Sequence, residues 1–256
     1  MIFNGQNFPF LNKITKPKIS VIGREKELSS LQEMQLKKRM KNIILVGDAG
    51  CGKTALIEEF ARRNKDQILV LELDLAIAVS GTQFRGDFEK KITAAFKELI
   101  KYKEMPVILF IDEIHTILKA GATDCMSLGD IIKPYLSSCE ITIIGATTPK
   151  EYENSIKQDF ALRRRLCPIF IKELQKNEII NVMSKFMKGN TKVMGLRCYE
   201  YIYAQSIKLS NNPNSGWYGI SNPDVSIEIL DRCQARANYK DIAISEELID
   251  EICSEM

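Results

Sequence analysis

The sequence has few of the features that mark exported, membrane-spanning or zinc-binding proteins. It contains one histidine, His115, and seven cysteines without a Cys-x-x-Cys pair. An odd number of cysteines at such spacings argues against a disulfide framework and against a Cys/His zinc site. No apolar run approaches the ~20 residues of a membrane span, and residues 1–20 lack the apolar core of a signal peptide. We therefore expect a cytoplasmic chain with reduced thiols and no membrane partner.

An excess of charge of one sign is also missing. The 256-residue chain carries 36 Lys and Arg against 33 Asp and Glu, a net charge of +3, which argues against a protein that coats nucleic acid. Two basic stretches, Lys37 to Lys41 and Lys97 to Lys103, have no aromatic platform or groove-reading motif beside them. They are typical of solvated helix faces, so a nucleic-acid partner is not expected.

Apolar runs typical of buried strands alternate with segments of helical spacing. The runs are 43–46, 68–71, 107–111, 141–144 and 169–171. Runs without polar interruption are typical of strands covered on both faces. After about Glu173 only helical patterns follow. We predict an α/β fold, with a parallel sheet between two layers of helices over residues 1–172 and a small helical domain over 173–256.

The small domain shows two helix starts and one loop. Asn222, Pro223 and Asp224 form a start signal, and another helix is predicted to begin at Ser245. The stretch Asn211 to Ser221 is the most loop-like part of the chain. Its Trp217 and Tyr218 either contact a partner or pack locally, and local packing is the preferred interpretation.

A phosphate-binding motif follows the first apolar run. Residues 47–54 read Gly-Asp-Ala-Gly-Cys-Gly-Lys-Thr and lead into a helical pattern, which is G-x-x-x-x-G-K-T in its strand-to-helix context. Its glycines let backbone amides turn toward phosphates, Lys53 supplies a positive charge, and Thr54 supplies a hydroxyl ligand for Mg²⁺. Cys51 is interpreted as an inert side chain. The residues predicted to bind ATP are Gly47, Asp48, Ala49, Gly50, Cys51, Gly52, Lys53, Thr54 and Ala55.

Two carboxylates follow the run 107–111. Asp112 and Glu113 come at the carboxyl end of this strand, where open α/β sheets bind ligands. We predict that Asp112, with Thr54, holds Mg²⁺, and that Glu113 activates the attacking water. His115 is interpreted as a hydrogen-bonding residue beside them and not as the catalytic base.

With both halves of a nucleotide site placed, the chain resembles the AAA+ ATPases, and in particular the first ATPase module of Clp-type unfoldase and disaggregase chaperones. The resemblance is dense from Ile19 to Arg165 and looser in the helical remainder. It implies a P-loop sheet with a helical lid, ATP hydrolysis, a ring that is a hexamer in the family, and threading of unfolded or partly folded proteins through a central pore. The stretches that carry it are VIGREKEL, LDLAIAVSGTQFRGDFE, VILFIDEIHT, LGDIIKPYL and IIGATTPKEYENSIKQDFALRRRL.

The resemblance also implies roles for single residues. Val21 and Ile22 would contact adenine, and Thr148 would be the polar sensor of the γ-phosphate. Arg164 and Arg165 match the arginine fingers that complete a neighbouring subunit's site, which requires a head-to-tail interface. Arg163 is an extra arginine where the family often has an acid.

A glycine-flanked aromatic loop matches the family's pore loop. The resemblance assigns substrate grip to Phe84, in the setting of Gly81, Arg85 and Gly86. An aromatic ring offers apolar contact without demanding a particular sequence. The same resemblance makes 120–127 a second pore-facing loop, although it has no aromatic residue.

Departures from the family leave alternatives open. The chain has no room for the amino-terminal adaptor domain, the coiled-coil middle domain or the second ATPase module. It is either a single-ring ATPase or a part of something longer, and an adaptor or a further ATPase module is left open as a partner. No arginine stands at Asn222 to Val225, where many AAA+ proteins have a second sensor. The alternatives are an AAA+ loader or regulator acting on nucleic acid, and an assembly module that binds ATP and turns over slowly.

Overall fold

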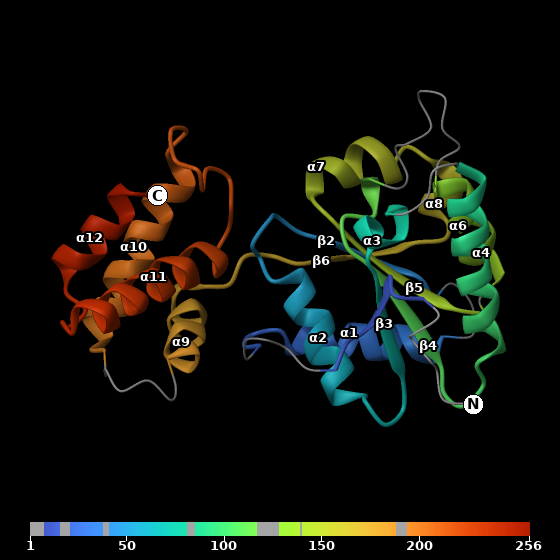
Figure 1. The fold of residues 1–256 in the computed structure, drawn as a ribbon, viewed down its shortest axis with the longest axis horizontal. Coiled ribbons are helices and arrows are strands. Elements are labelled where there is room, and N and C mark those ends of the chain that lie inside the picture. The colour runs from blue at the N-terminus through green and yellow to red at the C-terminus, as the bar shows by residue number, and fades with distance from the viewer. Residues whose placement is uncertain are drawn as a thin grey trace. The chain divides into compact units, whose positions relative to one another are not determined.

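The computed structural model describes residues 8–15, 21–37, 41–80, 85–116, 128–138, 140–187 and 194–256. The described strands form a six-stranded sheet in the order β1-β3-β4-β5-β2-β6 (Figure 1). All neighbouring pairs are parallel except β1 with β3. The predicted α/β fold class is therefore confirmed. The strands are β1 Leu11–Lys13, β2 Ile43–Val46, β3 Leu69–Leu73, β4 Val107–Ile111, β5 Thr142–Thr147 and β6 Cys167–Phe170.

Helices of the first part of the chain pack against this sheet. All residues of β2 and β4 are buried, as the apolar runs predict. Helices α4 and α6 lie side by side in Figure 1, joined by stacked rings of Phe96 and Tyr135 whose centroids are 4.2 Å apart. The described helices here are α1 Glu25–Leu36, α2 Lys53–Arg63, α3 Leu75–Val79, α4 Arg85–Lys101, α6 Leu128–Ser138, α7 Pro149–Glu151, the π-helix η2 Tyr152–Ile156 and α8 Phe160–Arg163.

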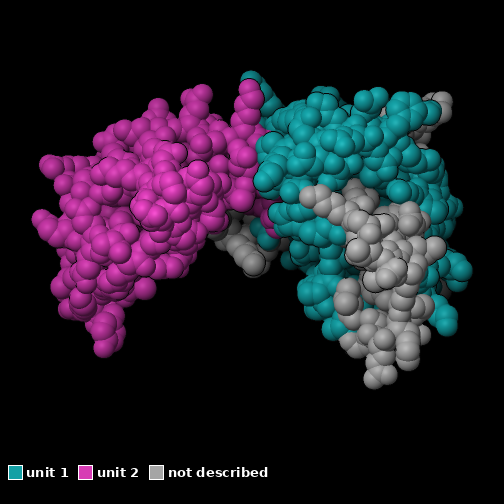
Figure 2. All heavy atoms as spheres, turned by 90° about the horizontal axis from the view of Figure 1, so that it is seen from above, with its two compact units in different colours: residues 1–17, 26–47, 56–170 teal, residues 18–25, 48–55, 171–256 magenta. Residues whose placement is uncertain are grey.

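Contacts divide the chain into two compact units, coloured separately in Figure 2. The first unit comprises residues 1–17, 26–47 and 56–170, and the second comprises 18–25, 48–55 and 171–256. The second unit therefore combines the phosphate-binding loop with the helices that follow the sheet. Those helices are α9 Lys176–Phe186, α10 Leu196–Asn211, α11 Asp224–Lys240 and α12 Glu246–Ser254.

The second unit has its own apolar core, and both predicted helix starts lie where expected. Ile202 of α10 and Ile229 of α11 are fully buried in this core. Helix α11 begins at Asp224. Helix α12 begins one residue after Ser245, whose hydroxyl oxygen accepts a hydrogen bond from the Leu248 amide at 3.3 Å. Such a cap satisfies an amide that the first helical turn leaves without a partner.

Helix length and hydropathy bear on a membrane location. Among the residues that the structure describes, we find no helix with both the length and the apolar character needed to span a bilayer.

Candidate functional site

The phosphate-binding loop lies between β2 and α2, in the strand-to-helix setting that the motif requires. Gly50 and Gly52 have φ values of +81° and +94°, which side chains other than glycine rarely adopt. Helix α2 begins at Lys53, so Lys53, Thr54 and Ala55 form its first turn. The unpaired amides of a first turn, with the helix dipole, favour an anion at this point.

Lys53 is held against the loop. Its side chain is almost fully buried, and Nζ donates a hydrogen bond to the Asp48 carbonyl at 2.9 Å. A Cβ atom added at Gly52 would meet no other atom within 4 Å, so the space beside this residue is open. An ammonium group, a threonine hydroxyl and helix-start amides are donors and ligands that suit a nucleotide phosphate and Mg²⁺. The loop therefore fits the nucleotide that its sequence predicts.

Arg24 supports the loop from the segment that precedes α1. Its guanidinium Nη2 donates to the Cys51 carbonyl at 2.7 Å, and only 4% of the residue is exposed. Burial raises the pKa of the Cys51 thiol, and a buried protonated thiol packs instead of reacting. Beside Arg24, the predicted adenine contacts Val21 and Ile22 are half-buried, and Ile22 packs against the second unit's core.

The loop before α11 contacts the phosphate-binding loop, which the sequence did not reveal. The Ser221 amide donates to the Ala49 carbonyl at 2.8 Å. A Cβ atom at Gly50 would lie 2.5 Å from the Ser221 carbonyl oxygen, so only glycine allows this approach. Nearby, Trp217 is half-buried against the second unit's core, whereas 60% of Tyr218 is exposed. The preferred interpretation, local packing, is therefore confirmed for Trp217.

The predicted acids stand at the carboxyl end of β4, in the first unit. The Glu113 amide donates to Asp112 Oδ1 at 2.9 Å, and the Ile114 amide donates to the Ala146 carbonyl at 3.0 Å. Glu113 itself has a φ of +44°. Positive φ at a residue with a long side chain costs free energy and is often found at functional sites. This turn ends β4 and leaves the Glu113 side chain 47% exposed.

His115 connects Glu113 to the neighbouring strand β5. Its Nδ1 atom lies 3.1 Å from Glu113 Oε2 and 3.0 Å from the hydroxyl of Thr147, which is fully buried. The Thr147 carbonyl accepts a hydrogen bond from the Gly47 amide at 3.1 Å, where the phosphate-binding loop begins. The prediction that His115 is a hydrogen-bonding residue beside the acids is confirmed.

Thr148, the predicted sensor, is the residue that directly follows β5. It is half-buried, and its hydroxyl oxygen accepts a hydrogen bond from the Glu151 amide at 3.3 Å, which caps α7. The carboxyl end of β5 thus offers one hydroxyl to His115 and one to the helix start. The sensor role of Thr148 stays a prediction.

The predicted arginine fingers follow the short helix α8. Arg163 and Arg164 are exposed, whereas Arg165 is half-buried and its Nη1 donates to the Ala161 carbonyl at 3.4 Å. The guanidinium groups of Arg163 and Arg164 lie 5.5 Å and 5.4 Å from the centre of the Phe160 ring. Arg164 is therefore presented on the surface of the first unit.

The predicted pore loop is described only at its end. Gly81 and Phe84 lie outside the described residues, as does the second loop at 120–127. Arg85 and Gly86 begin α4. The pore-loop assignments stay predictions.

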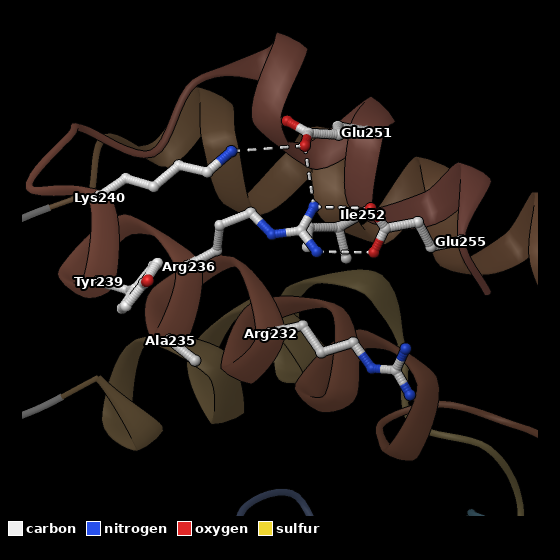
Figure 3. A pocket seen from close by; sticks show the side chains of 8 residues that line it. All are labelled: Arg232, Ala235, Arg236, Tyr239, Lys240, Glu251, Ile252 and Glu255. Atoms are coloured by element: carbon white, nitrogen blue, oxygen red, sulfur yellow. Dashed lines mark hydrogen bonds and ion pairs between the residues drawn. The ribbon is translucent and has the colours of Figure 1, made fainter.

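A hollow of about 700 Å³ on the second unit has a different character (Figure 3). Arg236 of α11 reaches across it to Glu251 at 3.0 Å and to Glu255 at 2.7 Å, both on α12 or its end. This arginine lowers the pKa of the Glu255 carboxyl. Arg236 and Lys240 pair with carboxylates of α12 or its end, and Arg232 pairs with Glu228 on its own helix. We therefore interpret the pairs that cross the hollow as contacts that hold α11 and α12 together.

The comparisons with known proteins agree with this geometry. A family model described as "ATPase family associated with various cellular activities (AAA)" matches residues 43–171. Chaperone protein ClpB of Clostridium perfringens is 35% identical over 225 residues, covering 84% of this chain and 25% of that protein. ClpB of Mycoplasmoides gallisepticum is 34% identical over 226 residues, covering 84% and 31%. The chain thus spans about a quarter to a third of the length of these relatives.

Solved structures are similar over more of the chain. A closed-state structure of Hsp104 with ATPγS and FITC casein matches with a TM-score of 0.79 and 25% identity, covering 96% of this chain and 44% of that one. The S. cerevisiae Hsp104–ADP complex matches with a TM-score of 0.74 and 26% identity, covering 90% and 34%. The family and these relatives support nucleotide binding and ATP hydrolysis. The chain belongs to the AAA family of ATPases, and it resembles an ATPase module of the Clp-type disaggregases.

Proposed function

We propose that this chain is the motor module of a ring-forming machine that hydrolyses ATP to thread polypeptide through a central pore. The observation that carries the proposal is the order of the strands: β5 lies between β2, which leads into the phosphate-binding loop, and β4, which is followed by Asp112 and Glu113. The loop itself has positive φ values at Gly50 and Gly52. Lys53 serves the loop and Glu113 the acid pair.

The loop and the acids divide the chemistry of phosphoanhydride cleavage. Loop amides and Lys53 bind the phosphates, while Thr54 and Asp112 are the residues that would hold Mg²⁺, which when bound neutralises charge on the β- and γ-phosphates. Glu113 takes the proton from the attacking water, an effect worth 10²–10⁴ in rate. His115 restrains the Glu113 carboxylate from a distance of 3.1 Å.

Arg164 and Arg165 complete the site of a neighbouring copy. An arginine supplied in trans contributes about 10³ to 10⁵ in rate in related phosphoryl-transfer enzymes. Because the donating and accepting surfaces differ, the contact is head-to-tail, and a head-to-tail contact whose rotation closes makes a ring. By resemblance the ring is a hexamer, in which Thr148 reports the γ-phosphate.

The polypeptide substrate is proposed from the relatives and from the aromatic loop. The similar Hsp104 structure was solved with casein. In this chain Phe84 would grip an unfolded or partly folded protein, with Gly81, Arg85 and Gly86 shaping the loop. An adaptor protein or a further ATPase module would act with it.

The test measures ATP turnover with and without unfolded casein, together with solution mass with and without ATP. Stimulation by casein and assembly with ATP are the expected results. Stimulation by DNA and not by casein would favour the nucleic-acid loader. Slow turnover, with assembly and turnover hardly changed by Glu113→Gln, would favour the nucleotide-switched module.

A further inference from the structure

We propose that Phe160 is a positioning residue that holds the finger Arg164 ready for the neighbouring subunit's nucleotide. Phe160 is 62% exposed, whereas phenylalanine is usually buried. The Arg164 guanidinium lies 5.4 Å from its ring centre, within the ~6 Å range of a cation–π contact. The inference rests on the proposed function, because it assigns Arg164 a site in trans.

The position of the ring is fixed by the backbone of α8. Asp159 caps this helix, with Oδ1 accepting from the amides of Ala161 at 2.8 Å and Leu162 at 3.1 Å. Leu162 and Leu166 are each 2% exposed and anchor the segment in the first unit's core. Phe160 therefore extends outward from a segment that is capped at its start and anchored in the core by the residues after the ring.

The two predicted fingers are held in different ways. Arg165 bonds back to the Ala161 carbonyl and is half-buried, so its guanidinium stays near its own helix. Arg164 is exposed and has the ring as its neighbour. A long arginine side chain samples many rotamers in water, and holding it before assembly lowers the entropy cost of inserting it into a partner. The geometry thus favours Arg164 as the finger that the ring serves.

Arg163 provides an internal control. It lies 5.5 Å from the same ring centre, and it occupies a position where the resembling family often has an acid. If the ring serves Arg164, removal of Arg163 leaves that contact intact.

The experiment compares Phe160→Ala, Phe160→Leu and Phe160→Tyr in the full chain under conditions where it assembles. Leucine keeps apolar volume without a π face, whereas tyrosine keeps the ring. We expect the alanine and leucine variants to lose about 2- to 5-fold in kcat, the size of an exposed cation–π contact, with an unchanged KM for ATP. Tyrosine should restore kcat, and Arg163→Ala should stay within about 2-fold of the unmodified chain.

A mixing experiment places the effect in trans. Phe160→Ala subunits keep their own acids, and Glu113→Gln subunits keep their own fingers. Mixed rings should therefore hydrolyse more ATP per Phe160→Ala subunit than Phe160→Ala rings alone. In an Arg164→Ala background, Phe160→Ala should cause no further loss.

Several results would overturn the proposal. Leucine that matches the unmodified chain, Arg163→Ala that costs as much as Phe160→Ala, or an additive effect in the Arg164→Ala background would each remove Phe160 from this role. If Arg164→Ala itself leaves kcat unchanged, the finger assignment of the proposed function fails, and the role of Phe160 fails with it.

Discussion

Two glycines of one loop should respond differently to alanine. Gly50 and Gly52 both have positive φ values, so each Gly→Ala change places a side chain in a left-handed backbone. That conformation costs roughly 1–2 kcal/mol. The surroundings differ, however. A Cβ at Gly50 would lie 2.5 Å from the Ser221 carbonyl and 2.8 Å from Asp224 Cβ, whereas a Cβ at Gly52 would meet nothing within 4 Å.

The magnitudes follow from that difference. Overpacking adds roughly 1–3 kcal/mol, so Gly50→Ala should lower the free energy of unfolding by about 2–5 kcal/mol and Gly52→Ala by about 1–2 kcal/mol. At about 2–4 °C per kcal/mol for a chain of this size, thermal unfolding without nucleotide separates the two variants. Gly50→Ala should also strain the hydrogen bond from the Ser221 amide to the Ala49 carbonyl, which is 2.8 Å long.

The loss of ATP affinity should be larger for Gly52→Ala than for Gly50→Ala, which is the opposite of the order expected for their losses in free energy of unfolding. The Cβ of Gly52→Ala would enter the open space where we place the phosphates, so ATP affinity should fall about tenfold or more, equal to at least ~1.4 kcal/mol. Titration with a fluorescent ATP analogue at a temperature where both variants are folded measures this. If Gly52→Ala binds like the unmodified chain, or melts as low as Gly50→Ala, the reasoning about this loop is refuted.

Other predictions test the first unit. Asn42 is 2% exposed and donates to the Leu136 carbonyl at 2.8 Å while accepting from the Ile143 amide at 2.9 Å. Asn42→Ala should lower the free energy of unfolding, measured with urea, by about 2–4 kcal/mol. A loss below about 1 kcal/mol would contradict this reasoning. Hydrogen bonds from Arg62 and Arg63 lower the pKa of Glu59 to about 2, against about 4.5 when unfolded. The unfolded chain therefore binds the proton more readily, so this stabilisation is complete above about pH 4.5 and is lost as the pH falls toward 2; Glu59→Gln should flatten that part of the pH profile of the urea midpoint, and an unchanged profile would contradict it. Glu113→Gln should lower kcat by about 10² or more with ATP affinity unchanged, which single-turnover and binding measurements separate; a comparable loss of affinity would argue against a role in activating water.

Sequence alone predicts the parts of this fold that show a regular apolar pattern or that carry a known motif. Runs such as Val107 to Ile111 mark buried strands because every side chain is apolar. The sequence does not predict strand β1, because this strand has three residues, of which only Leu11 is buried. The sequence predicts the phosphate-binding loop because glycines and a lysine at this spacing are typical of a loop that binds nucleotide phosphates.

The contacts that hold the site in shape could not be predicted in the same way. Arg24 bonds to a carbonyl 27 residues away and Asn42 to one 94 residues away, and any residue could have supplied those carbonyls. Glu113 has its positive φ in a turn whose next residue, Ile114, donates its amide to the carbonyl of the distant Ala146. Such features depend on tertiary neighbours, which local residue preferences do not specify.

The bond between Ser221 and Ala49 joins two main-chain groups. Side-chain replacements at either position leave the donor and the acceptor in place, and only proline at 221 deletes the donor. The segment before α11 is therefore bonded to the phosphate-binding loop by a contact that most substitutions at either position would leave intact. Because the acceptor belongs to the phosphate-binding loop and the donor lies just before α11, a shift of this loop would either move the start of α11 or break the bond.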